Sequence, residues 1–171
     1  MTTFNLRRVK LRTAEQFRDE VEVELEGLVL GGQEYLPVPS LAPAELAITQ
    51  ATTGSVLDLS FRVRLHGPCF RCLADTVLEL PIHAREYQAT NPGSDEDLRS
   101  PYVTDNVLDL SAWARDALAL DLPDKILCRP DCAGLCPVCG KDLNVEPHEH
   151  EETSPDPRWS ALDALRARAR N

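Results

Sequence analysis

Residues 128–150, CRPDCAGLCPVCGKDLNVEPHEH, contain four of the six cysteines of the chain and two of its four histidines. A second, smaller cluster lies far upstream, where Cys69 and Cys72 enclose Phe70 and Arg71. Thiol and imidazole groups at such short spacings are the side chains that bind zinc in proteins. We therefore expect a small β-rich body whose parts are tied together by metal bound to the two clusters.

The length of the chain, 171 residues, suits one domain, or one domain with an appendage. No stretch is apolar for long enough to span a membrane. The first residues, MTTFNLRRVKL, have neither the apolar segment nor the small-residue cleavage site of a secretory signal. We therefore expect a cytoplasmic protein. Thiols stay reduced there, so six cysteines indicate metal ligands or redox thiols rather than disulfides.

The net charge of −10 disfavours a general nucleic-acid binder, which would need a basic face to displace counterions from phosphates. It fits an acidic protein that meets basic partners. The basic residues are nevertheless gathered in three places, namely Arg7, Arg8, Lys10 and Arg12, then Arg62, Arg64 and Arg71, then Arg158, Arg166, Arg168 and Arg170. A local basic patch on an acidic body therefore stays open, although ordinary solvated surface charge is the more usual explanation.

Alternation of apolar and polar residues predicts strands in the first half of the chain. Residues 20–26 alternate strictly, which indicates a strand that continues through Leu28 and Leu30. Gly31-Gly32 then predicts a hairpin into a strand over 34–38, whose prolines place it at an edge of the sheet or outside it. A capping-box pattern at Thr13-Ala14-Glu15-Gln16 predicts a helical turn over about 14–19.

Three further strands are expected at 45–49, 57–65 and 78–84, by the same alternation. The pair Cys69 and Cys72 then lies at the tip between the last two of them. Two helices are expected from apolar residues at helical spacing, one of about 109–120 and a C-terminal one that begins after Asp156-Pro157.

The fold class that follows is α+β, with an antiparallel β-sheet body, a middle helix, a Cys-rich zinc module and a C-terminal helix. We divide the chain into a β-rich body with the first cysteine pair at 1–90, an acidic loop at 91–106, and the helix, zinc module and C-terminal helix at 107–171. We expect these parts to form one cooperative domain.

Eight side chains are candidate metal ligands: Cys69, Cys72, Cys128, Cys132, Cys136, Cys139, His148 and His150. We rank first a four-thiolate zinc site in which the two Cys-x-x-Cys turns, Cys69/Cys72 and Cys136/Cys139, share one ion. The other four candidates are then left for a second site. A competing arrangement keeps all ligands downstream, in the four later cysteines or in two of them with the histidines. We expect one or two structural zinc ions.

A catalytic role is weighed against the structural one. A Cys-x-x-Cys pair can be a thioredoxin-type dithiol, but Cys69 and Cys72 follow a strand rather than open a helix in a βαβ unit. The segment 134–142 departs from a phosphate-binding loop in spacing, and Asp142 replaces the hydroxyl residue after Lys141. We therefore predict that the protein is not an enzyme.

The order of motifs along the chain resembles the YceD family. Cys-x-x-Cys-Leu at 69–73 is followed by Asp-Leu at 109–110 and Leu-Asp-Leu-Pro at 120–123. Cys-x-x-x-Cys-x-Gly-Leu-Cys-Pro-x-Cys-Gly-x-x-Leu-Asn at 128–144 and Asp-Pro-Arg-Trp at 156–159 complete the pattern. Members of this family are bacterial and plastid proteins needed for accumulation of large-subunit ribosomal RNA.

The resemblance implies a non-enzymatic zinc-binding factor in ribosome biogenesis that promotes accumulation of 23S rRNA. Many relatives have Cys-x-Cys shortly after Leu-Asn, where this chain has His148 and His150, so the exchange favours both histidines as ligands. The implied partner is a large-subunit precursor or a basic, L32-like ribosomal protein, while direct rRNA contact is not favoured by the net charge. The alternatives are a zinc-stapled interaction module without a ribosomal role and a Cys-x-x-Cys thiol oxidoreductase.

Overall fold

The computed structural model describes residues 1–91 and 98–150. Within this part of the chain are nine β-strands, one short 3-10 helix and one α-helix. In chain order they are β1 (Thr3–Asn5), η1 (Leu6–Arg8), β2 (Gln16–Glu24), β3 (Leu28–Leu30), β4 (Gln33–Pro37), β5 (Leu41–Gln50), β6 (Gly54–Pro68), β7 (Asp75–Ala89), β8 (Val103–Thr104), β9 (Val107–Asp109) and α1 (Leu110–Asp121).

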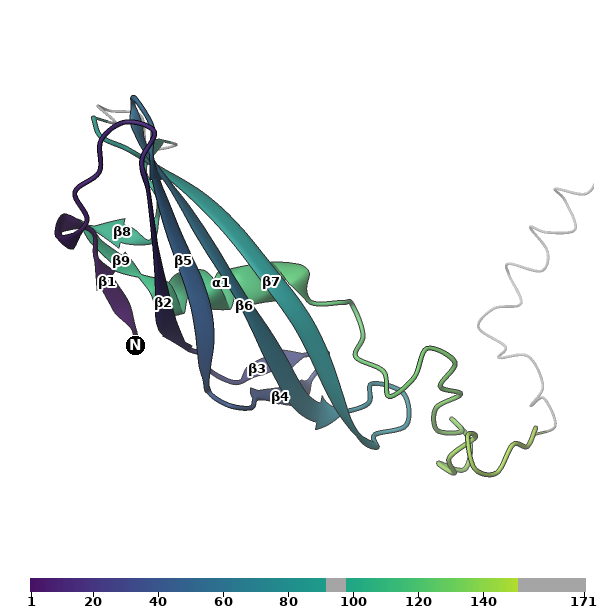
Figure 1. Ribbon diagram of the computed structural model, residues 1–171. Helices are drawn as coiled ribbons and strands as arrows, with labels where there is room; N and C mark the ends of the chain where they lie inside the picture. Colours follow the sequence, from purple (N-terminus) through teal and green to yellow (C-terminus); the bar gives the residue numbers. More distant parts are fainter. Residues whose placement is uncertain (92–97, 151–171) are drawn as a thin grey trace, which may run out of the picture.

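The long strand β6 organises a twisted antiparallel sheet (Figure 1). One edge of β6 pairs with β7 along the whole length of both strands, from Gly54 opposite Ala89 to Pro68 opposite Asp75. The other edge is shared, because β5 pairs with its first half and β4 with its end. β2 then pairs with β5 on the outside. The cysteine-bearing turn between β6 and β7 therefore stands at one end of this sheet.

Alternation along β6 explains which face of the sheet is covered. Five apolar side chains on one face are buried, and they are Leu57, Leu59, Phe61, Val63 and Leu65. Arg62, Arg64 and His66 on the other face are exposed. The strands predicted at 45–49, 57–65 and 78–84 are thus confirmed as parts of β5, β6 and β7.

The hairpin at Gly31-Gly32 is also confirmed, since it joins β3 to β4 and both glycines have positive φ angles. The placement of the return strand was wrong. Pro37 pairs with Leu65 of β6, so β4 lies inside the sheet and β3 is the edge strand beyond it. The strand predicted from 20 to 30 is interrupted as well, because β2 ends at Glu24 and β3 begins at Leu28.

The predicted helical turn over 14–19 is wrong, because β2 begins at Gln16 and pairs there with Thr49 of β5. The Glu15 carboxylate accepts a hydrogen bond from the backbone of Arg12 at 2.7 Å. It therefore caps the turn that precedes the strand. Ala14, with a φ of 69°, belongs to that turn and not to a helix.

The helix predicted over about 109–120 is present as α1, and the Asp109 carboxylate caps it by accepting from the Ala112 amide at 3.0 Å. It follows all nine strands, so it is not a middle helix, and no second α-helix occurs in residues 1–91 and 98–150. α1 lies against one face of the sheet (Figure 1). The predicted C-terminal helix lies outside the described residues.

Within the described residues, most buried apolar side chains belong to two separate clusters. The larger one joins the covered face of the sheet, the small sheet β1-β9-β8 and the inner face of α1, including Trp113. The smaller one consists of Cys69, Cys72 and Cys132. No helix of the described part is long and apolar enough to cross a membrane. The division of the chain at 90 and 106 stays a prediction.

Gly67 near the end of β6 gives a first test of the packing. A Cβ atom there would contact the ring of buried Tyr35 and come within 2.7 Å of the Glu34 carbonyl oxygen. Because Tyr35 is held by its hydroxyl, which donates to the Pro68 carbonyl at 2.9 Å, it cannot yield freely. We expect Gly67→Ala to lower the free energy of unfolding by about 2–3 kcal/mol in urea titrations.

The matched control is Gly32→Ala in the hairpin turn. No atom lies within 4 Å of a Cβ there, so only the positive φ of 80° opposes the change. Its expected cost is about 1 kcal/mol. A Gly67 variant that loses no more stability than the Gly32 variant would show that the Tyr35 contact is not tight.

Candidate metal centres

The first candidate centre begins in the turn between β6 and β7. The Cys69 amide donates to the Ala74 carbonyl at 2.7 Å, and the Leu73 amide donates to the Cys69 carbonyl at 3.0 Å. Leu73 adopts a φ of 61°, which closes the turn. Both cysteine side chains are buried as a result, and they come from a turn whose ends are held by the sheet.

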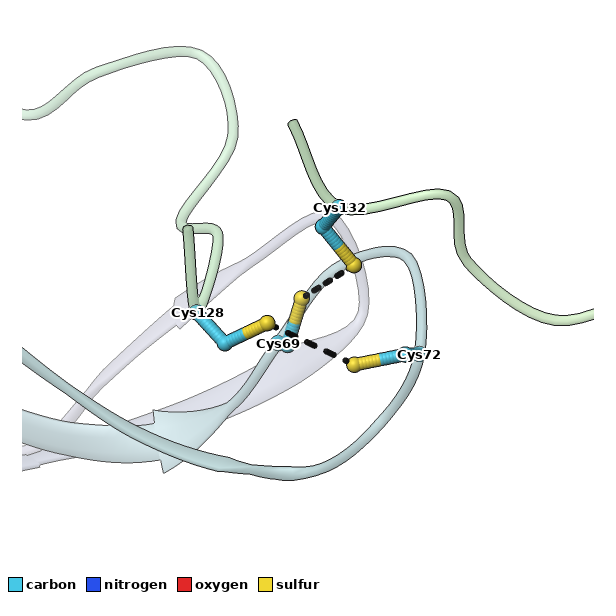
Figure 2. Close-up of side chains that lie close together, drawn as sticks. All are labelled: Cys69, Cys72, Cys128 and Cys132. Atoms are coloured by element: carbon cyan, nitrogen blue, oxygen red, sulfur yellow. Dashed lines mark hydrogen bonds between the residues drawn. The ribbon is translucent and has the colours of Figure 1, made fainter. Parts of the chain in front are cut away.

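The chain returns to this turn after α1. The Phe70 amide donates to the Ile126 carbonyl at 2.8 Å, which sets the following residues beside the turn. The sulfur atoms then lie 3.8 Å apart for Cys69 and Cys132, and 3.7 Å apart for Cys72 and Cys128 (Figure 2). All four sulfur atoms lie within 4.8 Å of one another.

These distances match a tetrahedral zinc site. Four sulfur atoms at about 2.3 Å from a central ion are separated by about 3.8 Å along each edge of the tetrahedron. They are too far apart for a disulfide, in which the sulfur atoms are about 2.05 Å apart, and all six cysteines are free. The cluster of Cys69, Cys72, Cys128 and Cys132 could therefore hold one metal ion.

The second candidate centre is formed within a short stretch of chain. Cys136, Cys139, His148 and His150 bring their ligand atoms within 4.8 Å of one another. The Gly140 amide donates to the Cys136 carbonyl at 2.8 Å, and a φ of 73° at Gly140 turns the chain back. The Cys139 sulfur lies 3.1 Å from Nε2 of His148. Cys139 and His150 are exposed, so this cluster faces solvent.

The grouping of the candidate ligands differs from the first-ranked arrangement, whereas the second cluster has the expected alternative of two downstream cysteines with the two histidines. The two Cys-x-x-Cys turns do not share a site, and the four downstream cysteines do not form one. The Leu135 amide donates to the Arg71 carbonyl at 3.0 Å, and Leu135 forms an isolated β-bridge with Asp142. The chain after Leu135 therefore makes its own turn, apart from the β6–β7 turn. All eight predicted residues lie in the two clusters, and their role as ligands stays a prediction.

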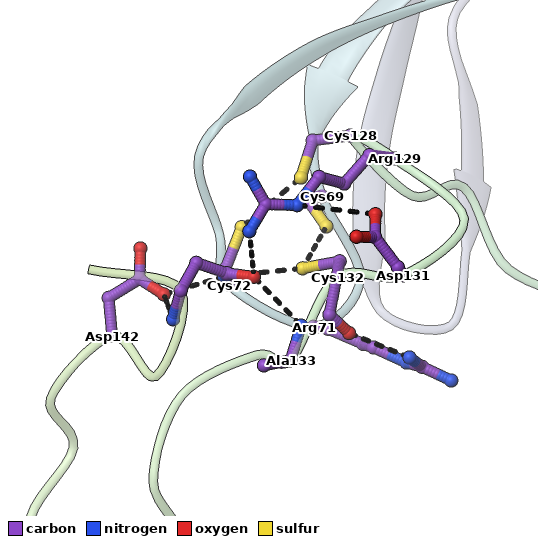
Figure 3. A network of polar contacts seen from close by, with 10 residues as sticks. Cys69, Arg71, Cys72, Cys128, Arg129, Asp131, Cys132, Ala133 and Asp142 are labelled. Carbon is purple, nitrogen blue, oxygen red and sulfur yellow. Dashed lines mark hydrogen bonds and ion pairs between the residues drawn. The ribbon is translucent and has the colours of Figure 1, made fainter. Parts of the chain in front are cut away.

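Asn144 connects the first centre to the chain around it, and the sequence did not single it out beyond its place in the Leu-Asn motif. Its amide nitrogen donates to the Cys132 sulfur at 3.5 Å and to the Asp142 carboxylate at 2.6 Å. Its amide oxygen accepts from the Arg129 guanidinium at 2.6 Å and from the Ala133 amide at 2.8 Å. Figure 3 shows its partners Arg129, Ala133 and Asp142 around the cysteines.

Arg71 is a second residue that sequence reasoning treated only as surface charge. Its guanidinium donates to the Cys132 carbonyl at 2.7 Å, as Figure 3 shows. Its own carbonyl accepts from Leu135. Arg71 therefore ties the β6–β7 turn to the returning segment at two points, Cys132 and Leu135.

The thiols of the first centre have unequal pKa values. Burial raises the pKa of Cys69, but hydrogen bonds from the backbone amides of Cys72, Cys128 and Arg71 outweigh burial and lower it to about 6. Desolvation of the sulfur, together with hydrogen bonds to the thiols of Cys132, Cys72 and Cys69, raises the pKa of Cys128 to about 12. One thiolate is therefore favoured near neutral pH, and thiolates are the form that binds metal.

One thiol of the second centre also has a lowered pKa. A hydrogen bond from the Cys139 amide is the main cause that lowers the pKa of Cys136 to about 6. The pKa of His148 is raised, first because its Nδ1 lies 2.8 Å from the Glu146 carbonyl oxygen and then because of Cys136. The bond to Glu146 also turns Nε2 toward the cysteines, as an outer hydrogen bond does for a metal-bound histidine.

Asn144→Ala tests whether this side chain orients the first centre. The change removes the hydrogen bond to the Cys132 sulfur and leaves the Arg129 guanidinium without its amide partner. Loss of such outer contacts typically weakens metal binding by about 10–100-fold. We expect that loss for zinc at the first centre, measured by competition with a chelating dye.

The control for Asn144 is Asp131→Asn, which alters the other partner of Arg129. The Asp131 carboxylate lies 3.4 Å from the guanidinium, is well exposed and has no hydrogen bond to a cysteine. Zinc affinity should be unchanged in this variant. Equal affinities for the Asn144 and Asp131 variants would mean that the amide does not position the sulfur.

The fold and the clusters together define an antiparallel sheet protein whose sequence-distant segments meet at four thiols, with a second Cys/His centre beside them. The family model described as large ribosomal RNA subunit accumulation protein YceD matches residues 57–166, and the chain belongs to this YceD family. The matched region includes both clusters, so the resemblance to this family is confirmed.

Curated relatives include uncharacterized proteins of Mycobacterium tuberculosis and Mycobacterium leprae. The first is 36% identical and aligns over 73% of this chain and 69% of the relative. The second is 33% identical, over 76% and 68% respectively. The uncharacterized protein YlbN of Bacillus subtilis is 29% identical, over 88% and 87%. No solved structure matches the chain.

Proposed function

We propose that this protein is a non-enzymatic zinc-binding factor in ribosome biogenesis that promotes accumulation of large-subunit 23S rRNA. The family description supports the ribosomal role. The observation that carries the zinc assignment is the pair of sulfur–sulfur distances, 3.8 and 3.7 Å, which fit the edges of a tetrahedron. Both centres take one zinc ion each in this proposal.

The ligand types favour a structural role for the metal. Four thiolates fill the coordination shell of zinc and leave no position for a reactive water. Zinc in the first centre joins the β6–β7 turn to the segment after α1. A thiol oxidoreductase fits less well, because Cys69 is fully buried and its sulfur lies beside Cys132.

The charge of the sheet supports a basic partner such as a ribosomal protein. Glu20, Glu22 and Glu24 are exposed along β2, and Glu20 lies directly opposite Glu45 of β5. Like charges in such a cross-strand pair are destabilising unless a cation joins them. Arg18 forms an ion pair with Glu45 and so supplies part of the positive charge that this acidic face needs. A basic protein bound in the cytoplasm would supply the rest.

Depletion of the protein in its host tests the proposed function. We expect the ratio of large- to small-subunit rRNA to fall and large-subunit precursors to accumulate, measured by RNA electrophoresis and sequencing. Re-expression of the natural chain should restore the ratio. An unchanged ratio after depletion would overturn the ribosomal role and leave a zinc-stapled interaction module.

A further inference from the structure

The segment 5–12, NLRRVKLR, carries four basic side chains on one short loop. Leu6, Val9 and Leu11 are half-buried and pack against the main core. The basic residues between them, Arg7, Arg8, Lys10 and Arg12, are all exposed. We call residues 5–12, with these four charges, the basic loop. Its apolar residues point inward and serve as anchors, so the charges are held on the surface.

The basic loop is fixed at both ends by backbone hydrogen bonds. The Leu6 amide donates to the Asn106 carbonyl at 2.9 Å, and the Asn5 side chain caps η1 by accepting from the Arg7 amide. At the other end the Ala14 amide donates to the Gln50 carbonyl at 2.8 Å. A fixed loop that carries charged side chains loses less conformational entropy on binding than a free tail with the same charges.

The basic loop differs in its ion pairing from the other basic positions of residues 1–91 and 98–150. None of its four side chains forms an ion pair in residues 1–91 and 98–150, whereas most arginines elsewhere in that part do. The paired arginines include Arg18, Arg64, Arg85, Arg115 and Arg129. Two carboxylates lie at the margin, Glu15, which bonds to the Arg12 backbone, and Asp105, which lines a cavity of about 480 Å³ beside the loop. Among the described residues, the local charge at the loop is therefore positive on a chain whose net charge is −10.

The basic loop lies far from both metal centres. β6 begins beside the loop and ends at the first centre, and its 15 residues span about 50 Å. Figure 1 shows the loop, in purple, at the opposite end of the sheet from the cysteine-rich segment. The loop also precedes the region matched by the family model, residues 57–166, so it is a feature of this chain that the family match does not cover.

We propose that the basic loop binds the phosphate backbone of RNA. This inference rests on the proposed function, which brings the protein to ribosomal RNA. Three of the four charges are guanidinium groups, whose fork of N–H donors matches phosphate oxygens. The loop adds a local RNA contact that the net charge alone argued against, and it leaves the acidic face of β2 free for a basic protein.

The test is binding of the full chain, loaded with zinc, to a fluorescein-labelled single-stranded RNA of mixed sequence. Four neutralised phosphates predict an affinity that falls about 50-fold between 50 and 200 mM salt. In the variant with Arg7, Arg8, Lys10 and Arg12 all changed to Gln, we expect a loss of similar size at 50 mM salt. The remaining salt dependence should be close to zero.

The matched control removes the same charge from paired positions. It changes four arginines to Gln: Arg18, Arg64, Arg85 and Arg115. Its net charge equals that of the basic-loop variant, so RNA affinity should stay within about 3-fold of the natural chain if position rather than net charge matters. Circular dichroism and zinc content confirm that both variants fold.

Three outcomes overturn the proposal: the natural chain fails to bind RNA, both variants lose affinity equally, or vesicles of phosphatidylglycerol bind as tightly as RNA. The depletion phenotype separates this failure from failure of the proposed function. A fall in large-subunit rRNA without RNA binding removes only the basic-loop proposal. RNA binding through the loop with unchanged rRNA after depletion removes only the ribosomal role.

Discussion

Cys132→Ser is expected to remove on the order of 10 kcal/mol of stabilisation from the segment after α1 when zinc is present. Cys132 is fully buried, and its sulfur lies 3.8 Å from that of Cys69 in the first centre. A structural zinc site stabilises the folded chain by its whole binding free energy, because the unfolded chain has no preformed site. A hydroxyl is a poor substitute for a thiolate, so most of this free energy is lost.

The sheet should survive this loss, because its core does not include the cysteines. Hydrogen exchange can show the difference residue by residue. The amides of Phe70 and Leu135 bond across the junction to Ile126 and Arg71, and we expect both to exchange quickly in the variant. Amides in the middle of β6 should stay protected. Zinc content should fall from two ions per chain to one.

Cys139→Ser is the control for Cys132→Ser. It removes a ligand from the second centre, which is exposed and built from residues 136–150 alone. One zinc ion should again be lost, but the Phe70 amide should keep its protection. Slow exchange at Phe70 in the Cys132 variant, with two zinc ions still bound, would refute the assignment of the first centre.

Trp113→Ala is expected to lower the free energy of unfolding of the main core by about 3–5 kcal/mol. Trp113 is 2% exposed and lies on the inner face of α1, where its ring stacks on Tyr102 with centroids 6.2 Å apart. The change leaves a cavity between the helix and the sheet, and a core of few aromatic residues has little bulk to fill it. Urea unfolding followed by far-ultraviolet circular dichroism measures the loss.

Leu120→Ala on the same helix is the control for Trp113. Leu120 is 87% exposed, so its truncation should change stability by no more than about 0.5 kcal/mol. If the two variants unfold at the same urea concentration, α1 does not pack on the sheet as described.

The long strands β5, β6 and β7 could be predicted because each carries its burial pattern locally. Leu57 to Leu65 alternate without interruption, and every second side chain is buried in β6. The helix was equally visible, since Asp109 caps it and its apolar residues recur at helical spacing. These signals need no knowledge of the rest of the chain.

The turn before β2 could not be predicted in the same way. Thr13 to Gln16 match a helix-capping pattern, but the pairing of Gln16 with Thr49 in β5 decides the structure there. The prediction that Pro37 places its strand at an edge of the sheet or outside it failed for a related reason. A proline is excluded only where its missing N–H would face a partner strand, and the local sequence does not tell which side of β4 faces β6.

For the candidate metal centres, too, the local features could be predicted from the sequence and the long-range contacts could not. The eight side chains were found from residue type and spacing, which are local properties. Their division into two groups depends on where the segment after α1 meets the β6–β7 turn. The bonds from Phe70 to Ile126 and from Leu135 to Arg71 fix that meeting point. The role of Asn144 was hidden too, because it acts through contacts with Cys132, Asp142 and Arg129 rather than through a motif of its own.

The wide separation of the two halves of the first centre sets an order of events during synthesis. Cys69 and Cys132 are 63 positions apart, and the main sheet strands, β2 to β7, are complete at Ala89. Chains fold from the N-terminal end as they emerge from the ribosome, so the sheet can form while the β6–β7 turn still offers only two thiols. Stable capture of the metal must wait until Cys128 and Cys132 have been translated. On the proposed zinc assignment, the first centre can therefore bind its metal stably only after α1 has been translated.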